Sequence, residues 1–189
     1  MSQPLSHNKS KMSTIKIHDK EFRISITNSE IENEIKRVAS DINIDYKGKR
    51  PILLAVLNGS FMFAAELMQN LDIECEISFV KLASYQGTST TGTVKELIGL
   101  NESIEDRDII IVEDIVDTGF TMQNMLSTLR EKAPASIQIA SLFVKPDKLQ
   151  VPIDVKYTVF TIPDRFIVGY GLDYDGLGRN LPNVYDVVE

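Results

Sequence analysis

Residues 109–121 read Ile109-Ile110-Ile111-Val112-Glu113-Asp114-Ile115-Val116-Asp117-Thr118-Gly119-Phe120-Thr121. The apolar run at the start is typical of a strand covered on both faces, as in a parallel sheet between helices. Two acids follow that run directly, and Thr118-Gly119 allows a sharp turn before a helix that begins near Thr121. The order of strand, acid pair, turn and helix therefore predicts an α/β fold with polar groups at a strand end.

The acids and the turn have the chemistry of a ribose 5-phosphate site. Carboxylates at the end of a buried strand are costly unless they meet metal, hydroxyl groups or water. Adjacent strand residues point to opposite faces, so Glu113 and Asp114 cannot act side by side unless the strand has ended. The amides of the turn and of the helix start form an anion site, to which Thr118 and Thr121 add hydroxyl donors. The alternative is that the acids are exposed loop residues and that Asp117 is an ordinary helix cap.

Composition narrows the range of partners. The chain has 189 residues and a formal net charge of −7, whereas a nucleic-acid partner would require clustered Lys and Arg. We therefore expect no nucleic-acid partner. An acidic protein that binds a polyphosphate must neutralise it locally, and a divalent metal held by carboxylates does this. The stretch at 109–121 is not a Walker loop, because no G-x-x-x-x-G-K-[ST] pattern occurs.

The chain length is that of one domain. Residues 1–13 are polar and lack the apolar core of a signal peptide, so we expect a disordered tail, a single domain over 14–189 and a cytoplasmic protein. No apolar run approaches the roughly 20 residues that span a bilayer, so we expect no membrane partner. The single cysteine, Cys75, cannot form an internal disulfide.

Elements along the chain alternate between strands and helices. Residues 15–18 and 22–26 alternate apolar and polar and predict a hairpin. Ser29 and Glu32 fit a capping box before a helix with one apolar face. The further predicted strands are 52–57, 76–83, 94–100, 108–116, 137–144, 157–162 and a short last one at 167–172, and the further helices are 61–71 and 121–132. This order predicts a doubly wound, mainly parallel sheet with ligands at the carboxyl ends of its strands.

The stretch at 109–121 resembles the phosphoribosyl pyrophosphate motif of the phosphoribosyltransferases. Further segments, in the family's order over about residues 50–180, narrow the resemblance to the hypoxanthine (hypoxanthine–guanine) phosphoribosyltransferases. These segments are Val56-Leu57-Asn58-Gly59-Ser60-Phe61-Met62-Phe63, Ser84-Tyr85, Ser89-Thr90-Thr91-Gly92, Val144-Lys145-Pro146 and Ile162-Pro163-Asp164-Arg165-Phe166-Ile167-Val168-Gly169-Tyr170-Gly171-Leu172-Asp173-Tyr174. The resemblance implies a type I phosphoribosyltransferase fold, with a small hood formed by the N- and C-terminal segments and a flexible loop at about 84–93.

The resemblance also implies the reaction and its cofactor. A purine salvage enzyme of this family transfers the 5-phosphoribosyl group from phosphoribosyl pyrophosphate to hypoxanthine, and here to guanine as well, giving IMP or GMP and pyrophosphate. Mg²⁺ is the implied cofactor, with Glu113, Asp114 and Asp173 as its residues. Glu113 and Asp114 would hold the ribose hydroxyls directly or through the metal, and Asp117 would act as general base or proton relay. The implied 5-phosphate site is Asp117, Thr118, Gly119, Phe120 and Thr121.

The remaining implied roles concern the purine and pyrophosphate. Lys145 would donate to the purine's 6-oxo group, Phe166 would stack on the ring, and the Ile167 backbone would read the base edge. Asp173 is also implied as a purine-binding residue. The implied pyrophosphate residues are Asn58, Gly59, Lys81, Ser84, Tyr85 and Arg179. Asn58 departs from the family, which often has lysine there, so we expect one favourable charge to be missing. The loop at 84–93 would close over the reaction.

Other interpretations of the sequence remain open. A xanthine–guanine phosphoribosyltransferase shares the fold, and its base preference depends on the surroundings of the purine 2-position. A non-catalytic regulator that binds phosphoribosyl pyrophosphate is the alternative from another class, although Asp117 is present and no basic cluster suggests RNA binding. A homodimer or homotetramer is expected from the family, and the apolar residues Phe61, Met62 and Phe63 suit a subunit interface.

Overall fold

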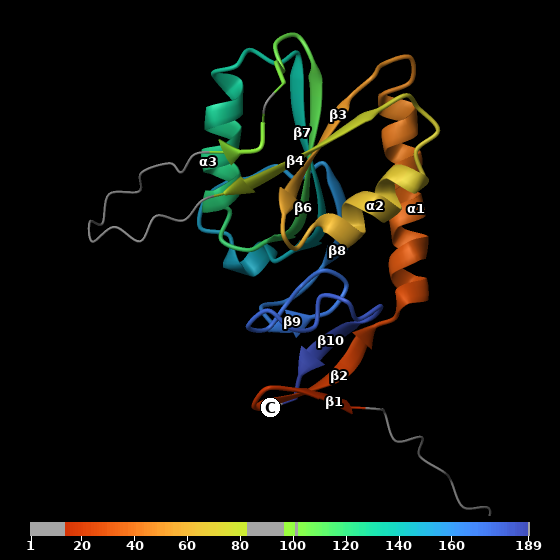
Figure 1. Cartoon of the computed structure of the whole chain (residues 1–189), viewed down its shortest axis with the longest axis vertical. Helices are drawn as coiled ribbons and strands as arrows, with labels where there is room; N and C mark the ends of the chain where they lie inside the picture. The colour runs from red at the N-terminus through yellow and green to blue at the C-terminus, as the bar shows by residue number, and fades with distance from the viewer. Residues whose placement is uncertain (1–13, 83–96, 101, 189) are drawn as a thin grey trace, which may run out of the picture.

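The computed structural model describes residues 14–82, 97–100 and 102–188. Two sheets lie one above the other, with the larger sheet flanked by helices and the smaller one beneath it (Figure 1). The predicted tail at 1–13 and most of the predicted loop and strand over 84–100 fall outside the described residues. No described helix has the length and apolar character needed to cross a bilayer.

The larger sheet has the strand order β5-β4-β3-β6-β7-β8. All neighbouring pairs are parallel except β4 and β5, which are antiparallel. The predicted α/β fold with a mainly parallel sheet is therefore confirmed. The strands are β3 (Ile52–Leu57), β4 (Glu76–Leu82), β5 (Leu97–Ile98), β6 (Asp108–Val116), β7 (Ser136–Val144) and β8 (Tyr157–Thr161).

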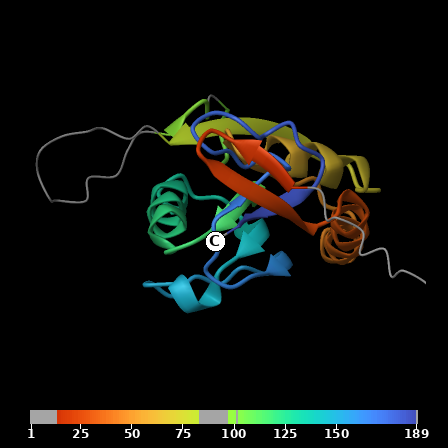
Figure 2. The ribbon, with the colours of Figure 1, turned by 90° about the horizontal axis from the view of Figure 1, so that it is seen from below.

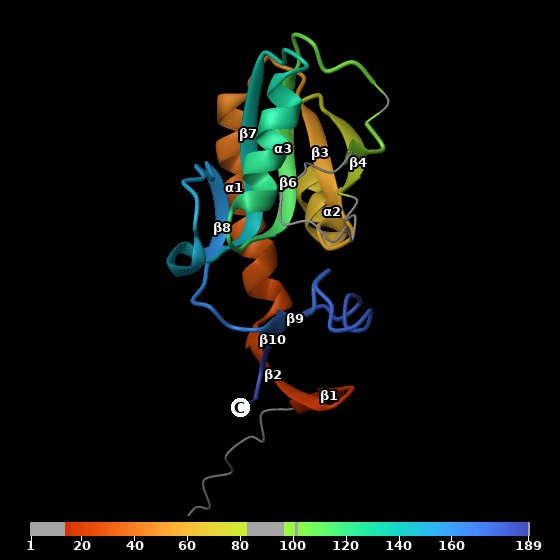
Figure 3. The same cartoon turned by 90° about the vertical axis from the view of Figure 1, so that its left-hand side faces the viewer.

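Helices cover both faces of this sheet, which explains its continuous apolar strands. On one face, α1 (Asn28–Asp45) and α2 (Phe61–Gln69) pack against alternate residues of β3 and β6, such as Leu53 and Ile110. On the other face, α3 (Phe120–Arg130) packs against the intervening residues, such as Leu54 and Ile111. Figures 2 and 3 show α1 and α3 on opposite sides of the sheet.

The start of α1 differs from the sequence prediction. The capping box is formed by Thr27 and Glu30, not by Ser29 and Glu32: the Glu30 side chain accepts from the Thr27 backbone N–H at 2.8 Å. Both pairs satisfy the same motif spacing, so the pattern alone does not choose between them. The predicted apolar face is confirmed, because Ile31, Ile35, Val38 and Ile42 are all buried.

The smaller sheet is the predicted hood. The hairpin of β1 (Thr14–Ile17) and β2 (Lys20–Ile26) pairs with two strands from the other end of the chain, in the order β1-β2-β10-β9. β9 is Ile167–Val168, so the strand predicted over 167–172 is shorter than expected. It is also not the last one, since β10 (Val184–Val187) follows and pairs with both β2 and β9.

Candidate functional site

Parallel pairing brings the carboxyl ends of five strands, β4, β3, β6, β7 and β8, to one edge of the larger sheet. Leu57 of β3 lies opposite Lys81 of β4, and Val116 of β6 lies opposite Val144 of β7. The hood reaches this edge, because Gly171 packs so closely on the Gly59 carbonyl that a Cβ there would overlap it. The predicted ligand site is thus lined by strand ends and covered by the hood.

Glu113 and Asp114 lie within β6 rather than beyond its end. Pairing of β6 with β3 stops at Val112, whereas pairing with β7 continues to Val116. Glu113 is 6% exposed, and its Oε2 atom has no hydrogen-bond partner among the described residues. Burial, together with the neighbouring carboxyl of Asp114, raises the pKa of Glu113 well above its ordinary value. The two acids therefore lie where β6 has left β3 and still pairs with β7.

Asp114 faces the loop between β3 and α2. The Asp114 backbone N–H donates to Glu113 Oε1 at 3.2 Å, and the Ile115 N–H donates to Asp114 Oδ1 at 2.9 Å. Asp114 Oδ2 lies where a Cβ at residue 59 would have to be, so only glycine fits there. Asn58 next to it is exposed, and the Leu57–Asn58 peptide bond is cis.

The predicted phosphate site is a turn that leads into α3. Gly119 has a φ of 87°, which favours glycine, and precedes the first helical residue, Phe120. The first backbone bond of the helix runs from Gln123 N to Gly119 O at 2.9 Å, so the N–H groups of residues 120–122 precede it. Such N–H groups bind anions well. A Cβ at Gly119 would also lie 2.9 Å from Val151 Cγ2, so the turn lies close to the segment after β7 and has little room for a side chain.

Lys145 joins a cluster of two lysines and two aspartates at the end of β7. Its side chain is 7% exposed, and its Nζ lies 3.0 Å from Asp164 Oδ1 and 4.0 Å from Asp117 Oδ1. Lys148 Nζ lies 3.1 Å from Asp117 Oδ2 and 3.2 Å from Asp164 Oδ1. Hydrogen bonds to both lysines lower the pKa of Asp164, and those to Asp117 and Asp164 raise the pKa of Lys148.

Lys148 and Asp164 were not predicted as site residues. Lys148 lies on the 3₁₀ turn η1 (Pro146–Lys148), directly after the strand end that carries Lys145. Asp164 lies within the segment that carries the family resemblance, two residues before Phe166. Proximity to predicted residues was therefore the available signal, but the contact between Lys148 and Asp164 spans 16 residues and depends on the fold.

Phe166, the residue predicted to stack on the purine, is partly exposed to solvent. Phe166 is 43% exposed, although its ring centroid lies 5.5 Å from that of Tyr174 in a T-shaped arrangement. Phe166 and Asp164 line a cavity of about 480 Å³ together with Arg23, Arg165 and residues 186–188. Ile167 is buried and lies opposite Asp186 in the pairing of β9 with β10.

The predicted pyrophosphate residues occupy the same edge where they are described. Arg179 NH1 donates to the Gly171 carbonyl at 2.7 Å, and Gly171 abuts Gly59. Arg179 NH2 also lies 2.7 Å from Asp173 Oδ1, while Asp173 Oδ2 accepts from the Gly176 N–H at 2.7 Å. Lys81 is exposed. Ser84 and Tyr85 lie outside the described residues.

A metal would depend on the substrate for several of its ligands. No group of at least three His, Cys, Asp or Glu side chains in the described residues is arranged to hold a metal ion. Mg²⁺ characteristically takes one or two protein carboxylates and completes its shell with substrate phosphates and water. The buried, unpartnered Oε2 of Glu113 beside Asp114 fits that mode of binding.

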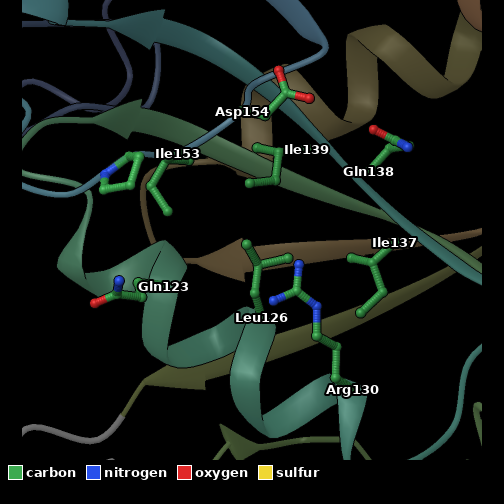
Figure 4. A pocket seen from close by; sticks show the side chains of 9 residues that line it. Gln123, Leu126, Arg130, Ile137, Gln138, Ile139, Ile153 and Asp154 are labelled. Carbon is green, nitrogen blue, oxygen red and sulfur yellow. The ribbon is translucent and has the colours of Figure 1, made fainter.

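A cavity elsewhere on the molecule contains none of the predicted residues. It has a volume of about 450 Å³ and lies between α3, the start of β7 and residues 152–154 (Figure 4). Leu126, Ile137 and Ile153 point into it, with Arg130 at one side. The strand-end site is therefore distinct from this hollow.

Comparison with known proteins defines the class first. The family described as the phosphoribosyl transferase domain matches residues 25–175. The chain belongs to this phosphoribosyltransferase family and, within it, to the hypoxanthine-guanine phosphoribosyltransferases. The hypoxanthine-guanine phosphoribosyltransferase of Streptococcus pneumoniae is 39% identical over 163 residues, which are 86% of this chain and 91% of that protein.

Solved structures agree with this placement. A hypoxanthine phosphoribosyltransferase from Staphylococcus aureus is 37% identical with a TM-score of 0.82, over 88% of this chain and 91% of that one. The hypoxanthine phosphoribosyl transferase of Trypanosoma cruzi is 33% identical with a TM-score of 0.83, over 92% of this chain and 95% of that one. The predicted family, fold and enzyme class are confirmed.

Proposed function

We propose that this chain transfers the 5-phosphoribosyl group of phosphoribosyl pyrophosphate to hypoxanthine and guanine. The products are IMP or GMP and pyrophosphate. The observation that carries the proposal is Lys145, a buried ammonium at the strand end beside Asp117 and the phosphate turn. A buried N–H donor there suits a 6-oxopurine, whereas the 6-amino group of adenine would leave it unpaired.

The 5-phosphate is proposed to bind the backbone of residues 117–121 and the Thr118 and Thr121 hydroxyls. Glu113 and Asp114 would hold the ribose hydroxyls beside it, which gives the unpartnered Glu113 Oε2 a partner. Mg²⁺ would neutralise the leaving pyrophosphate as the bond from the anomeric carbon to oxygen breaks. Asn58, Gly59, Lys81 and Arg179 form the proposed pyrophosphate side of the site, with Ser84 and Tyr85 contributing from the loop.

Asp117 is proposed to take or relay the proton that the purine loses as its nitrogen bonds to the anomeric carbon. Asp117 Oδ1 is buried without a hydrogen-bond partner among the described residues, so an acceptor is available. Phe166 would stack on the ring and the Ile167 backbone would contact its edge. Asp173 would support a second metal ion once its pair with Arg179 rearranges.

A spectrophotometric assay with the purified chain tests this function. Hypoxanthine, guanine, xanthine and adenine are each supplied with phosphoribosyl pyrophosphate, with Mg²⁺ or with a chelator. We expect turnover with hypoxanthine and guanine, little with adenine, and none without metal. Faster turnover of xanthine would make the chain a xanthine–guanine enzyme, and binding of phosphoribosyl pyrophosphate without turnover of any base would make it a regulator.

Assembly and location belong to the same proposal. Phe61 on α2 is 42% exposed and Phe79 on β4 is 43% exposed, so apolar surface is available for a homodimer or homotetramer. Light scattering after size-exclusion chromatography distinguishes these states from a monomer. A cytoplasmic location suits the reaction, because the charged sugar phosphate does not cross a bilayer unaided, and cell fractionation tests it.

A further inference from the structure

Lys145 and Asp117, the two groups that would act on the purine, carry opposite charges and lie close together. Their nearest atoms are 4.0 Å apart, and the Lys145 side chain is 7% exposed. A buried ammonium needs a carboxylate partner, and a direct pair with Asp117 would engage both groups with each other. Another residue must therefore hold Lys145 if both are to remain available.

Asp164 is in the position to do this. Its Oδ1 accepts from Lys145 Nζ at 3.0 Å, which is 1.0 Å shorter than the 4.0 Å separation of Lys145 from Asp117. Among the described residues, Asp164 is the only carboxylate within hydrogen-bond distance of that ammonium. We propose that Asp164 is a positioning residue of the purine site that holds Lys145 away from Asp117 and so sets the recognition of the purine's 6-oxo group.

Lys148 completes the arrangement because it contacts both acids, and on Asp164 it shares the Oδ1 atom with Lys145. Its Nζ lies 3.1 Å from Asp117 Oδ2 and 3.2 Å from Asp164 Oδ1. The four side chains thus form a ring in which lysine and aspartate alternate. Its longest contact is the 4.0 Å between Lys145 and Asp117. Lys148 contacts Asp117 at Oδ2, and the buried Asp117 Oδ1 has no hydrogen-bond partner in the part of the chain that the structure describes.

The chemistry of an ammonium explains why position decides recognition. Lys145 has three N–H donors in a tetrahedral arrangement. With one donor fixed on Asp164, the directions of the others are restricted, and one of them can meet a carbonyl oxygen of a bound base. Without Asp164, the attraction of Asp117 directs the ammonium to the proton acceptor instead.

This inference rests on the proposed function, and its test is the change Asp164→Ala with Asp164→Asn beside it. For Asp164→Ala we expect the KM for hypoxanthine to rise about tenfold, the scale of a charge-assisted hydrogen bond reduced by its partial exposure. The KM for phosphoribosyl pyrophosphate should change less than about twofold, because the phosphate turn is untouched. Asp164→Asn should recover part of the loss, since its amide oxygen still accepts from Lys145.

Asp147→Ala is the matched control. Asp147 is exposed, lies next to Lys148 on the same turn and has no ion pair in the described part of the chain. This change removes the same charge from the same neighbourhood, and we expect both KM values to stay at the wild-type level. A tenfold rise in the KM for hypoxanthine in this control as well would show that the loss of any negative charge near the site is enough. That result would overturn the positioning role of Asp164.

The remaining outcomes separate this inference from the proposed function. Wild-type chain without hypoxanthine turnover contradicts the proposed function itself. Active wild-type chain together with an unchanged hypoxanthine KM in Asp164→Ala contradicts the positioning role alone. Equal increases of both KM values with a lower urea midpoint would indicate a structural role, and this too overturns the inference. Titration calorimetry with ribose 5-phosphate should give equal affinity in all variants if only the purine side has changed.

Discussion

The carboxylate of Asp114 occupies the space that a side chain at residue 59 would need. Asp114 Oδ2 and its carbon Cγ both lie within overlap distance of an ideal Cβ at Gly59. Gly59 has an ordinary backbone conformation and is not needed for a positive φ. The glycine is therefore required by the approach of the acid, which couples the loop after β3 to the acid pair of β6.

Gly59→Ala is expected to displace Asp114 or the loop. Its Cβ would overlap the Oδ2 and Cγ atoms of Asp114, so either the carboxylate must turn away or the loop must shift. Misplacement of a binding group by about 1 Å can reduce a rate roughly 100-fold. We expect a loss of that size in kcat/KM for phosphoribosyl pyrophosphate, measured by steady-state kinetics.

Gly48→Ala is the matched control for that change. Gly48 precedes β3 at its amino end, has a φ of 76°, and has no atom within 4 Å of an added Cβ. Alanine there costs about 1–2 kcal/mol of backbone strain. We expect a lower urea midpoint with unchanged kinetics, so an equal kinetic loss in both variants would show that Gly59 acts only through stability.

Asp117→Asn tests the proton acceptor. The amide keeps nearly the same shape beside Lys148 but cannot take a proton, and general-base catalysis contributes about 100- to 10,000-fold. We expect kcat to fall by at least about 100-fold. Binding of IMP, followed by calorimetry, should weaken much less. Full turnover would show that Asp117 only orients the purine.

Lys145→Met tests selection by the 6-oxo group. Methionine keeps an unbranched side chain at this buried position but has no donor. Discrimination from an unmet buried hydrogen bond reaches roughly 10,000-fold, so the preference for hypoxanthine over adenine should fall by at least about 100-fold. The measurement is the ratio of kcat/KM for the two bases. An unchanged ratio would place the selectivity in another residue.

Local patterns predicted the elements that lie close together along the chain. The apolar run at 109–112 and the acids after it define β6, and the alternation around residues 15–26 defines the hairpin. β10 was missed because Val184–Val187 is only four residues long and its partner β2 lies near the other end of the chain. Short strands supported by distant partners have little signal of their own.

In the site, too, residues that lie close together in the sequence could be predicted, and contacts between distant segments could not. Glu113, Asp114 and residues 117–121 follow one strand, so their neighbourhood could be predicted from chain order. The contact of Asp164 with Lys145 and Lys148 joins β7, η1 and the segment after β8. Ionic contacts of this kind depend on side-chain direction at two separate strand ends, which sequence spacing does not provide.

Asn58→Lys tests the departure from the family. Asn58 is exposed, and its neighbour Leu57 lies opposite Lys81, so a lysine there adds a charge at the proposed pyrophosphate side without a packing cost. We expect the inhibition constant of pyrophosphate to fall about twofold to fivefold, at the scale of a solvated charge pair. The change should weaken at high salt. An unchanged constant would show that the loop binds through its backbone alone.

Glu113→Gln tests the cost of the buried acid in the absence of substrate. Burial and the Asp114 carboxyl raise the pKa of Glu113 above its ordinary value of 4.5. At a pH just above 4.5, Glu113 therefore keeps its proton in the folded chain and loses it in the unfolded chain. Glu113 therefore does not lower the free energy of unfolding at low pH. The free energy of unfolding falls as the pH rises from 4.5 toward the pKa of Glu113 in the folded chain.

Glutamine has no such proton to lose, so Glu113→Gln should have the higher free energy of unfolding at pH 8. We expect the gain because ionisation of the buried carboxyl costs free energy that the neutral amide does not. The difference between variant and wild type should shrink at pH 4.5, where the wild-type carboxyl is largely protonated in the folded chain. Urea unfolding at both pH values measures it, and equal differences at the two would mean that the carboxyl is not strained by burial. The same variant should bind phosphoribosyl pyrophosphate and Mg²⁺ more weakly, because the charge that destabilises the free chain is the one proposed to meet the ribose and its metal.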